Sequence, residues 1–310
     1  MDLATLFKKG FRFIFDKDYR FVENSAYGFY NSWPDEKYLK TKFKCIMGYE
    51  LNLDNPITYN EKIQWLKLYD RKPEYSMMVD KYRVREYIAE KIGKEYLIPL
   101  LGVWNSPNDI NFDELPNEFV LKCNHNSGRG VCICKDKAKL NIQKVKKELD
   151  KALKQDYYLF NREWPYKDVP RKIICEKYMT DSSGFELKDY KLYAFDGIVQ
   201  ALMVISGRNT GCTCANYYDA NFKQLDFTWG YPKIPNEIKI PESFGQMKAF
   251  AEILSKGLPE VRIDFYDING QLYFGEITFF DGSGFEKFNP KEWDKKFGEW
   301  ITLPNKKNIG

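Results

Sequence analysis

Histidine is almost absent from this chain, with His125 as the single example among 310 residues. A structural zinc site normally combines histidines with cysteines, or uses cysteines in C-x-x-C spacing. The seven cysteines instead include two C-x-C pairs, Cys132 with Cys134 and Cys212 with Cys214. Alternation along a β-strand places both members of such a pair on one face, so we interpret them as structural thiols rather than zinc ligands.

Long apolar runs are absent too. None reaches the roughly 18 residues that a membrane-spanning helix needs. The longest, YLIPLLGVW at 96–104, contains a proline and predicts a buried strand or loop. The opening segment MDLATLFKKGFRFIF lacks the apolar core and small-residue cleavage site of a signal peptide. An odd number of cysteines without an export signal favours reduced thiols and a cytoplasmic location.

A strong charge of either sign is missing as well. The net charge is +4 at neutral pH and is spread along the chain, so we expect no nucleic-acid partner. Residues 8–20 are a local exception, because five Lys or Arg are mixed there with Phe and Tyr. This segment predicts either an ordinary amphipathic helix or a helix in peripheral contact with the inner face of a membrane. The oligomeric state stays open.

Neither common phosphate-binding loop, G-x-x-x-x-G-K-[ST] or G-x-G-x-x-G, occurs in the chain. Residues 121–131 read LKCNHNSGRGV, in which an apolar strand delivers Lys122 to a small, flexible segment before strand texture resumes. The segment predicts either a hairpin with a polar tip or a flap whose backbone N–H groups wrap an anion. We interpret His125 as a phosphate contact or a turn residue rather than a proton-transfer group.

The rest of the chain alternates helical and strand patterns. Thr58 and Glu61 have capping-box spacing at the start of one helix, and Asp196-Gly197 predicts the turn of a hairpin. We expect helices from 58, over 76–93, 138–156 and 244–257, and strands over 171–179, 189–206 and 261–279. The fold class is therefore α+β (α/β), with mainly antiparallel pairing in the second half.

The last hairpin, at 261–279, admits two registers. A two-residue turn at 269–270 would place Glu276 opposite Ile263, on the apolar face. A three-residue loop with a glycine bulge would place Glu276 opposite Arg262. We predict the bulged turn, because only that register separates charged from apolar side chains.

In that register Asp264 and Thr278 lie on the same face as Arg262 and Glu276. The opposite, apolar face would carry Val261, Ile263, Phe265, Tyr273, Ile277 and Phe279. The charged face has two readings. It is either a solvated face with an ion pair or a Mg²⁺ site, since hard cations prefer carboxylate oxygens and share themselves with phosphates.

Two further strands carry polar groups that could reach the same cleft. In DYKLYAF, alternation places Asp189, Lys191 and Tyr193 on one face, and IICEKYM ends an apolar strand at Glu176. Each could be an ordinary surface charge. Their order along the chain is more specific: a lysine with a glycine-containing loop, a hinge acid, a second lysine, then Asp and Glu on a late hairpin.

That order, and long stretches of sequence, resemble the teichuronopeptide-biosynthesis (TupA-like) branch of the ATP-grasp superfamily, which is often labelled polysaccharide biosynthesis protein or glycosyltransferase. The resemblance runs from NPITYNEKIQWLKLYDRKPEY through LPNEFVLKCNHNSGRGVCICKDK and VRIDFYDINGQLYFGEITFFDGSGFEKFNP to EWDKKFGEWITLP. It implies two lobes of antiparallel sheet and helices that clasp ATP. We expect a mostly helical region at 1–105, a lobe with the flap at 106–180 and a lobe with the metal site at 181–310.

The resemblance also implies roles for single residues. Nucleotide contacts would come from Lys122, His125, Asn126, Ser127, Gly128, Arg129, Gly130, Glu176, Lys177, Tyr178, Met179, Glu186, Asp189 and Lys191. One or two Mg²⁺ ions would be held by Asp264, Glu276 and Thr278, and Lys191, Arg262 and Arg208 would assist the reaction. Many relatives have Asn where this chain has Thr278, so a second ion would be held more loosely.

The implied activity is an ATP-dependent carboxylate–amine ligase that forms an amide through an acyl phosphate. Its substrates would be a small-molecule or glycan carboxylate, such as a sugar acid of a cell-surface polysaccharide, and an amine or amino acid. Three alternatives stay open: a kinase that phosphorylates a sugar or lipid hydroxyl, a capsular glycosyltransferase and a non-catalytic carbohydrate-binding protein. A metal-dependent glycosyltransferase usually carries Asp-x-Asp at a strand end, and the motif occurs here only at Asp16-Lys17-Asp18.

Overall fold

The structure is a computed structural model that describes residues 3–181, 187–207 and 211–305. Its helices are α1 Leu3–Phe15, α2 Lys17–Ala26, α3 Asp35–Met47, α4 Tyr59–Tyr69, α5 Glu74–Val79, α6 Val84–Lys91, α7 Ile142–Leu153, α8 Tyr158–Asn161, α9 Phe244–Ser255 and α10 Glu292–Trp300. No helix in this part of the chain is both long and apolar enough to cross a membrane.

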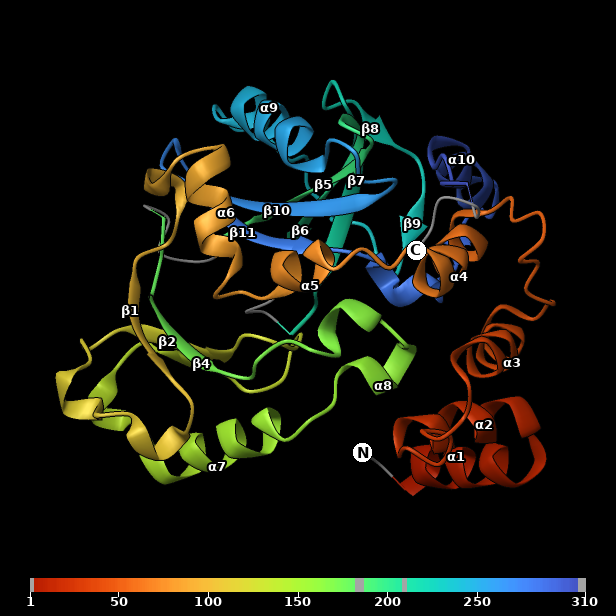
Figure 1. Ribbon diagram of the computed structural model, residues 1–310, viewed down its shortest axis with the longest axis horizontal. Coiled ribbons are helices and arrows are strands. Elements are labelled where there is room, and N and C mark those ends of the chain that lie inside the picture. The colour runs from red at the N-terminus through yellow and green to blue at the C-terminus, as the bar shows by residue number, and fades with distance from the viewer. Residues whose placement is uncertain (1–2, 182–186, 208–210, 306–310) are drawn as a thin grey trace.

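Two antiparallel sheets face each other across the middle of the molecule (Figure 1). The small sheet has the order β1-β4-β2-β3, with β1 Leu100–Trp104, β2 Phe119–Cys123, β3 Val131–Cys134 and β4 Ile173–Lys177. The large sheet has the order β11-β10-β5-β6-β7-β8, with β5 Asp189–Phe195, β6 Ile198–Ser206, β7 Cys214–Asp219, β8 Gln224–Leu225, β10 Val261–Ile268 and β11 Gln271–Thr278. A short pair joins β9 Thr228–Trp229 to β12 Phe288–Asn289.

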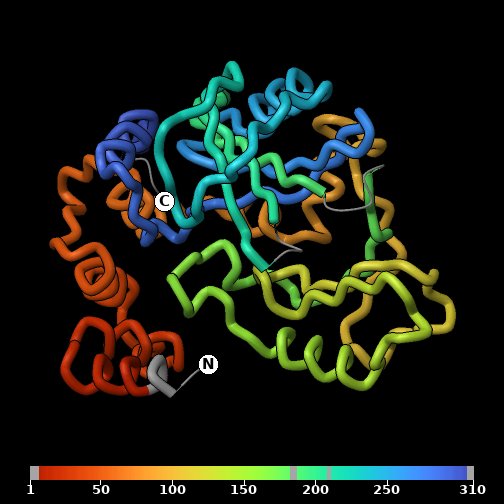
Figure 2. The backbone as a smooth tube through the Cα atoms, turned by 180° about the vertical axis from the view of Figure 1, so that it is seen from behind, coloured from red at the N-terminus to blue at the C-terminus, as the bar shows by residue number. Residues whose placement is uncertain are grey.

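Helices cover the outer face of each sheet. Helix α7 packs under the small sheet through Leu149 and Ala152, in a core separate from that of the large sheet, and α9 covers the large sheet above β5 and β6. Both views show α1, α2 and α3 at the opposite end of the molecule from the small sheet's α7 (Figures 1 and 2). The α+β class and the antiparallel pairing of the second half are thus confirmed.

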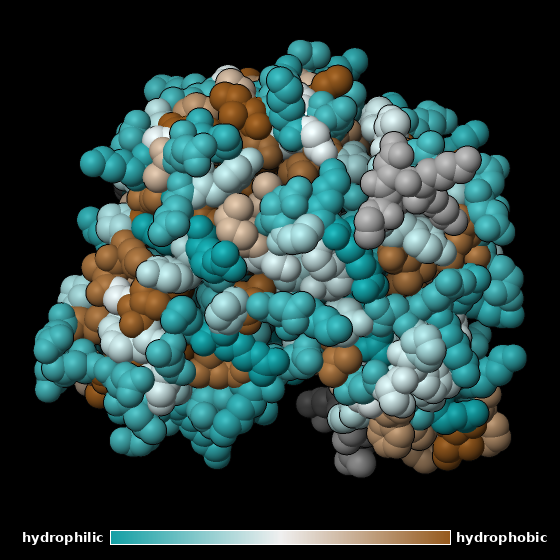
Figure 3. Space-filling model, in the orientation of Figure 1, coloured by the Kyte–Doolittle hydropathy of each residue, from teal (hydrophilic) through white to brown (hydrophobic). Residues whose placement is uncertain are grey.

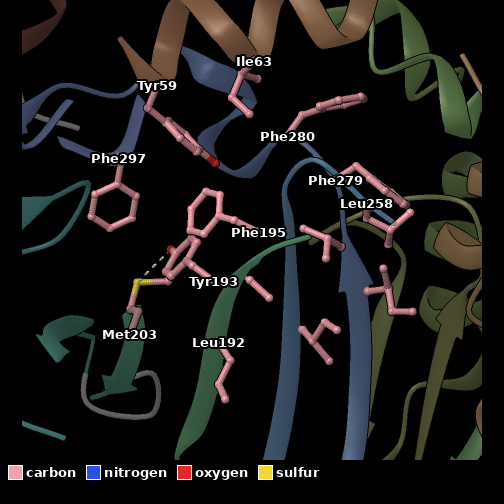
Figure 4. Packing of buried hydrophobic residues seen from close by; sticks show 14 of the residues in the cluster. Tyr59, Ile63, Leu192, Tyr193, Phe195, Met203, Leu258, Phe279, Phe280 and Phe297 are labelled. Atoms are coloured by element: carbon pink, nitrogen blue, oxygen red, sulfur yellow. Dashed lines mark hydrogen bonds between the residues drawn. The ribbon is translucent and has the colours of Figure 1, made fainter. Parts of the chain in front are cut away.

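The large core fills the space between the large sheet, α4 and α10. Figure 4 shows Tyr59, Tyr193 and Phe297 converging there, with the Tyr193 hydroxyl 4.0 Å from the Met203 sulfur. These side chains are almost fully buried. Burial of apolar surface at about 25 cal/mol per Å² makes this cluster the main support of the sheet that carries the charged residues.

Several predicted elements are confirmed. Helix α4 begins at the predicted capping box, in which the Thr58 side chain accepts from Glu61 N and the Glu61 carboxylate accepts from Thr58 N. The hairpin of β5 and β6 turns at Asp196-Gly197, both with positive φ. Strand β1 falls inside the region predicted to be helical, yet it pairs with β4 of the small sheet.

The single helix predicted over 76–93 is wrong, because the chain breaks at Asp80 into α5 and α6. The Asp80 carboxylate accepts from the backbone N–H groups of Tyr82 and Arg83 and from the Asn124 side chain. A short acceptor that bonds to its own backbone competes with helix continuation. The break brings Lys81 toward the space between the sheets.

Candidate active site

A cavity of about 550 Å³ lies between the two sheets. The small sheet contributes Lys122 and the loop that follows it, and the large sheet contributes Lys191 and Asp264. The α5–α6 break adds Lys81, and the short helix Asp281–Gly284 closes the far side. The cavity therefore gathers charged groups from segments far apart in the sequence.

The register of the last hairpin differs from both alternatives drawn from the sequence. Ile268 pairs with Gln271 around a two-residue turn, in which Asn269 and Gly270 have φ of 55° and 84°, as a type I′ turn requires. The predicted three-residue loop is therefore wrong. Farther along, the register shifts by one residue between the Asp264–Glu276 and Phe265–Phe274 pairs.

That shift is a β-bulge at Gly275, and it has two consequences. It sets Asp264 directly opposite Glu276 and Arg262 opposite Thr278, so the four predicted residues share one face although the predicted pairing is incorrect. Between the bulge and the turn it also reverses, relative to the prediction, which side chains point toward the core. Leu272 and Phe274 are therefore buried, whereas Tyr273 is not. The predicted place of Tyr273 on the apolar face is therefore wrong.

Arg262 is the centre of the charged face. Its guanidinium donates to Asp264 at 2.7 and 2.9 Å, to Glu276 at 3.1 Å and to Thr278 Oγ1 at 3.1 Å. It also pairs with Asp281. This buried arginine satisfies carboxylates from both strands at once, which fixes their orientation toward the cavity.

The two carboxylates are held by further cations. Lys191 forms an ion pair with Asp264, and Lys81 Nζ lies 3.4 Å from Glu276 Oε2. Burial alone would raise the pKa of Glu276, but Lys81, Lys191 and Arg262 together hold this pKa far below its ordinary range. Glu276 is therefore an anion under all ordinary conditions.

These carboxylates fit the donor set of a magnesium site. Asp264 and Glu276 face each other across the hairpin with the Thr278 hydroxyl beside them, and all three offer oxygen. Among the described residues, no three acidic, cysteine or histidine side chains cluster to form an all-protein metal site. Two carboxylates suit Mg²⁺, which keeps waters and shares its remaining positions with phosphates.

The loop at 124–130, which we call the flap, joins β2 to β3 in the predicted hairpin. Lys122 pairs with Val131 at the end of the ladder, and Asn126, Ser127 and Gly128 line the cavity. Gly130 has a φ of 66° and lies where an added Cβ would be 2.4 Å from the Ala152 Cβ, so only glycine fits there. The loop is therefore closely fitted to α7 at its base.

His125 and Arg129 do not line the cavity. His125 is buried, with Nε2 3.2 Å from the Gln155 carbonyl oxygen, which matches the turn-residue reading rather than the phosphate-contact reading. The Arg129 guanidinium lies 5.2 Å from the centre of the Phe160 ring. Their assignment as nucleotide contacts stays a prediction that this geometry does not support.

A second, more apolar pocket of about 310 Å³ adjoins the cavity. Ile98, Val120 and Ile133 form its apolar wall. The predicted hinge residues Glu176, Lys177, Tyr178 and Met179 form its edge. It shares Lys122, Val131, Asp189, Tyr266 and Gly275 with the cavity, so the two hollows meet.

At their junction Lys122 Nζ lies 2.6 Å from Glu176 Oε2, and Arg85 reaches the other oxygen of Glu176 at 3.3 Å. Asp189 lines both hollows and is buried. Glu186 and Arg208, the remaining predicted site residues, lie outside the described residues.

Several residues of the cavity were missed from the sequence. Lys81 was assigned to a helix, and Asp281 was given no role. Asp281 accepts from the Tyr193 hydroxyl at 2.6 Å as well as pairing with Arg262. The Asp80-Lys81 pair at the helix break and the acid that begins Asp-Gly-Ser-Gly at 281–284 were the available signals.

Glu163 is a further buried carboxylate on the cavity wall. It accepts from the Ser283 hydroxyl. Nearby, Lys67 is fully buried and donates to the carbonyl oxygens of Asn161 and Ser283. Burial lowers the pKa of Lys67 to about 7. Glu163 and Lys67 both contact Ser283, so together they hold the short helix Asp281–Gly284 in place.

Glu286 differs from the other carboxylates of the cavity. It lines the cavity and is exposed, and although Asn60 donates to its backbone carbonyl oxygen at 3.0 Å, its carboxylate has no hydrogen-bond or ion-pair partner within the described residues. Its oxygens lie close to Gly230 and Gly282, where an added Cβ would approach them to 2.5 and 3.1 Å. Burial and the nearby Asp281 carboxylate raise the pKa of Glu286 to about 7.

Two facing antiparallel sheets, a flap and paired carboxylates opposite lysines make up the ATP-grasp fold. The chain belongs to the TupA-like ATP-grasp family. The model of this family, described as TupA-like ATPgrasp, matches residues 61–302. The family and the fold predicted from the sequence are thereby confirmed.

Solved ATP-grasp ligases are similar to the chain in outline. D-alanine–D-alanine ligase from Bacillus anthracis is 23% identical with a TM-score of 0.39, and the match covers 66% of this chain and 57% of that one. The Helicobacter pylori enzyme is 20% identical with a TM-score of 0.41, covering 78% and 69%. The ATP-grasp ligase PsnB, complexed with a precursor variant, Mg and ADP, is 11% identical with a TM-score of 0.41, covering 82% and 65%.

The chain spans less than two thirds of the length of the Bacillus anthracis ligase. No residue role follows from similarities at this level. No curated protein matches the chain.

Proposed function

We propose that this chain is an ATP-dependent carboxylate–amine ligase, which activates a carboxylate as an acyl phosphate and then forms an amide. The observation that carries the proposal is the continuity of the two hollows. An apolar pocket suited to a purine opens into a cavity where Lys122, Lys191 and Arg262 lie near Asp264 and Glu276. Phosphoryl transfer depends mainly on such charge neutralisation and positioning.

In this proposal adenine occupies the apolar pocket against Glu176 to Met179, and Lys122 at the junction contacts the α- and β-phosphates. Lys81 and Lys191 stand farther into the cavity, at the γ-phosphate. The flap residues Asn126, Ser127 and Gly128 would close over the triphosphate and exclude water, which would otherwise hydrolyse an acyl phosphate.

Asp264, Glu276 and Thr278 would hold Mg²⁺. When bound, the ion would neutralise charge on the phosphates that meet at this face. The Lys191 and Arg262 contacts to Asp264 keep the carboxylates oriented before the nucleotide arrives.

The reaction takes two steps. A carboxylate oxygen of the substrate attacks the γ-phosphorus, the bond to the bridging oxygen of ADP breaks, and an acyl phosphate forms. An amine nitrogen then attacks the acyl carbon and inorganic phosphate leaves. We assign the proton released from the amine to Glu286, because this carboxylate faces the cavity without a cationic partner and its pKa is near neutrality.

The family context suggests a sugar acid of a cell-surface polysaccharide as the carboxylate, with an amino acid or amine as the second substrate. Tyr231 supports this class, because it lines the cavity and is 37% exposed. Aromatic side chains offer flat apolar surface with polar edges, which suits a sugar ring.

A hydroxylamine trap tests the proposal. The protein receives ATP, Mg²⁺, hydroxylamine and a panel of uronic acids and amino acids, and ADP and hydroxamate are measured. Hydroxamate that forms with one acid and is lost in Asp264→Asn establishes the acyl phosphate and identifies the acid. A stable phosphorylated product without hydroxamate would instead identify a kinase.

A further inference from the structure

The hairpin of α1 and α2 lies at the edge of the molecule, away from both sheets (Figures 1 and 2). Brown, apolar spheres gather on the lower right of the space-filling view, where Figure 1 places this hairpin (Figure 3). The site described above uses no residue of either helix. The exposed apolar surface therefore needs its own explanation.

The apolar side chains of α1 form a continuous exposed face. Phe7, Phe11, Ile14 and Phe15 are 81%, 58%, 64% and 70% exposed. Phe7, Phe11 and Ile14 follow each other at spacings of four and three, which places them on one stripe of the helix. The Phe11 and Phe15 rings contact each other at 4.5 Å, so the stripe widens at its C-terminal end.

Lys8 borders this face, whereas Lys9, two positions after Phe7, lies on the other side of the helix. Lys8 and Lys9 are exposed and have no ion-pair partner within the described residues, and α1 contains no acidic residue. Arg12 lies 3.2 Å from Asp16 and above the Tyr19 ring. The charge on the α1 surface is therefore uniformly positive.

The face is preformed rather than loose. Arg20 donates to the carbonyl oxygens of Phe13 and Ile14 at 3.0 and 2.7 Å, which satisfies the C-terminal end of α1. Asp16 caps α2 by accepting from Asp18 and Tyr19 N–H groups. On its inner side, α2 is anchored by the stacking of Phe21 on Tyr30 at 4.4 Å.

We propose that the α1 face docks on the surface of a bilayer that contains anionic phospholipids. Phenylalanine rings would enter the interface between headgroups and acyl chains, and Lys8 would contact lipid phosphates, while Lys9 would add positive charge to the helix. A second copy of the chain is the less suitable occupant. An isologous contact along this short helix would bring the unpaired lysines of two copies together, whereas an anionic bilayer neutralises them.

The experiment is co-sedimentation of the full chain with vesicles of equal parts phosphatidylglycerol and phosphatidylcholine, and with phosphatidylcholine alone. We expect binding to the anionic vesicles that falls with added salt. The variants Phe7→Ser/Phe11→Ser and Lys8→Glu/Lys9→Glu should each weaken it by about tenfold or more. Ile240→Ser/Ile253→Ser is the matched control, because it removes two exposed apolar side chains elsewhere and should bind like the wild type.

Two results would overturn the proposal. One is no binding to either vesicle, or equal loss of binding in the control variant. The other is a dimer, measured by light scattering during size-exclusion chromatography, that Phe7→Ser/Phe11→Ser converts to a monomer without any vesicle binding. Circular dichroism and ATP turnover of each variant separate a lost surface from a lost fold, since no altered residue lines the cavity.

Discussion

Lys81 joins the flap to the paired carboxylates of the last hairpin. Its Nζ donates to the carbonyl oxygen of Asn126 at 2.9 Å and lies 3.4 Å from Glu276 Oε2. Its backbone N–H donates to the carbonyl oxygen of Asn124 as well. One residue at a helix break thus contacts the base of the flap and the carboxylates of the last hairpin together.

We expect Lys81→Met to lower ATP turnover by about a hundredfold, because a positioned cationic donor is lost from the cavity. Lys81→Arg should keep part of the activity, since it keeps the charge. Lys295→Met, which removes an exposed lysine, is the matched control. Steady-state ADP release measures the effect, and turnover equal to the control would contradict the role of Lys81.

Asp264→Asn and Glu276→Gln should abolish the dependence of ATP affinity on Mg²⁺, because each removes one of two anionic ligands. Isothermal titration of ATP with and without Mg²⁺ measures this directly. Glu237→Gln alters an exposed carboxylate and should behave like the wild type. If Mg²⁺ still strengthens ATP binding in both site variants, the ion is held elsewhere.

Glu286→Gln should separate the two steps of the reaction. With a pKa of about 7, Glu286 gains its basic form as pH rises from 6 to 8, so amide formation should increase over that window in the wild type. The variant should lose this increase but still form hydroxamate, because hydroxylamine is uncharged and needs no base. Equal losses with the amine and with hydroxylamine would show that Glu286 acts on ATP or on folding instead.

Glu260 should make stability depend on pH. It is buried, and the Tyr59 hydroxyl donates to it at 3.0 Å. Burial raises its pKa from 4.5 to about 8. Between pH 4.5 and about 8, the folded state therefore keeps a proton that the unfolded state has released. The free energy of unfolding falls as pH rises through this window.

The loss is on the order of 1.4 kcal/mol per pH unit over that window. Glu260→Gln keeps an acceptor for Tyr59 and cannot ionise, so its thermal midpoint should change less from pH 5 to 8. Denaturation followed by circular dichroism at several pH values measures both proteins. Parallel curves for the two proteins would mean that Glu260 does not carry the dependence.

The sequence was sufficient where local chemistry decides the structure. The Thr58–Glu61 capping box and the Asp196-Gly197 turn depend only on neighbouring residues, and both are present as predicted. The Asp80 break was missed because its third contact comes from Asn124, on a different lobe. Helical periodicity on either side gave no sign of that partner.

The candidate site shows the same division. Grouping Arg262, Asp264, Glu276 and Thr278 on one face followed from separating charge from core, and the structure places them together. The pairing itself failed, since a bulge inside a strand compensated for a turn of a different length. Glu163 and Lys67 could not be assigned, because their contacts join segments about a hundred residues apart.

The bulge at Gly275 sets which side chains of the last hairpin share a face. Side chains alternate along a strand, so one extra residue decides which half of the strand faces the nucleotide and which faces the core. The turn keeps its tight geometry at one end while the carboxylates keep their partners at the other, and the bulge reconciles the two. If this glycine were paired within a regular ladder instead of forming the bulge, every ligand would remain in the sequence, yet Glu276 would lie opposite Ile263 and face the interior. The bulge in β11 is thus as much a part of the site as the carboxylates themselves.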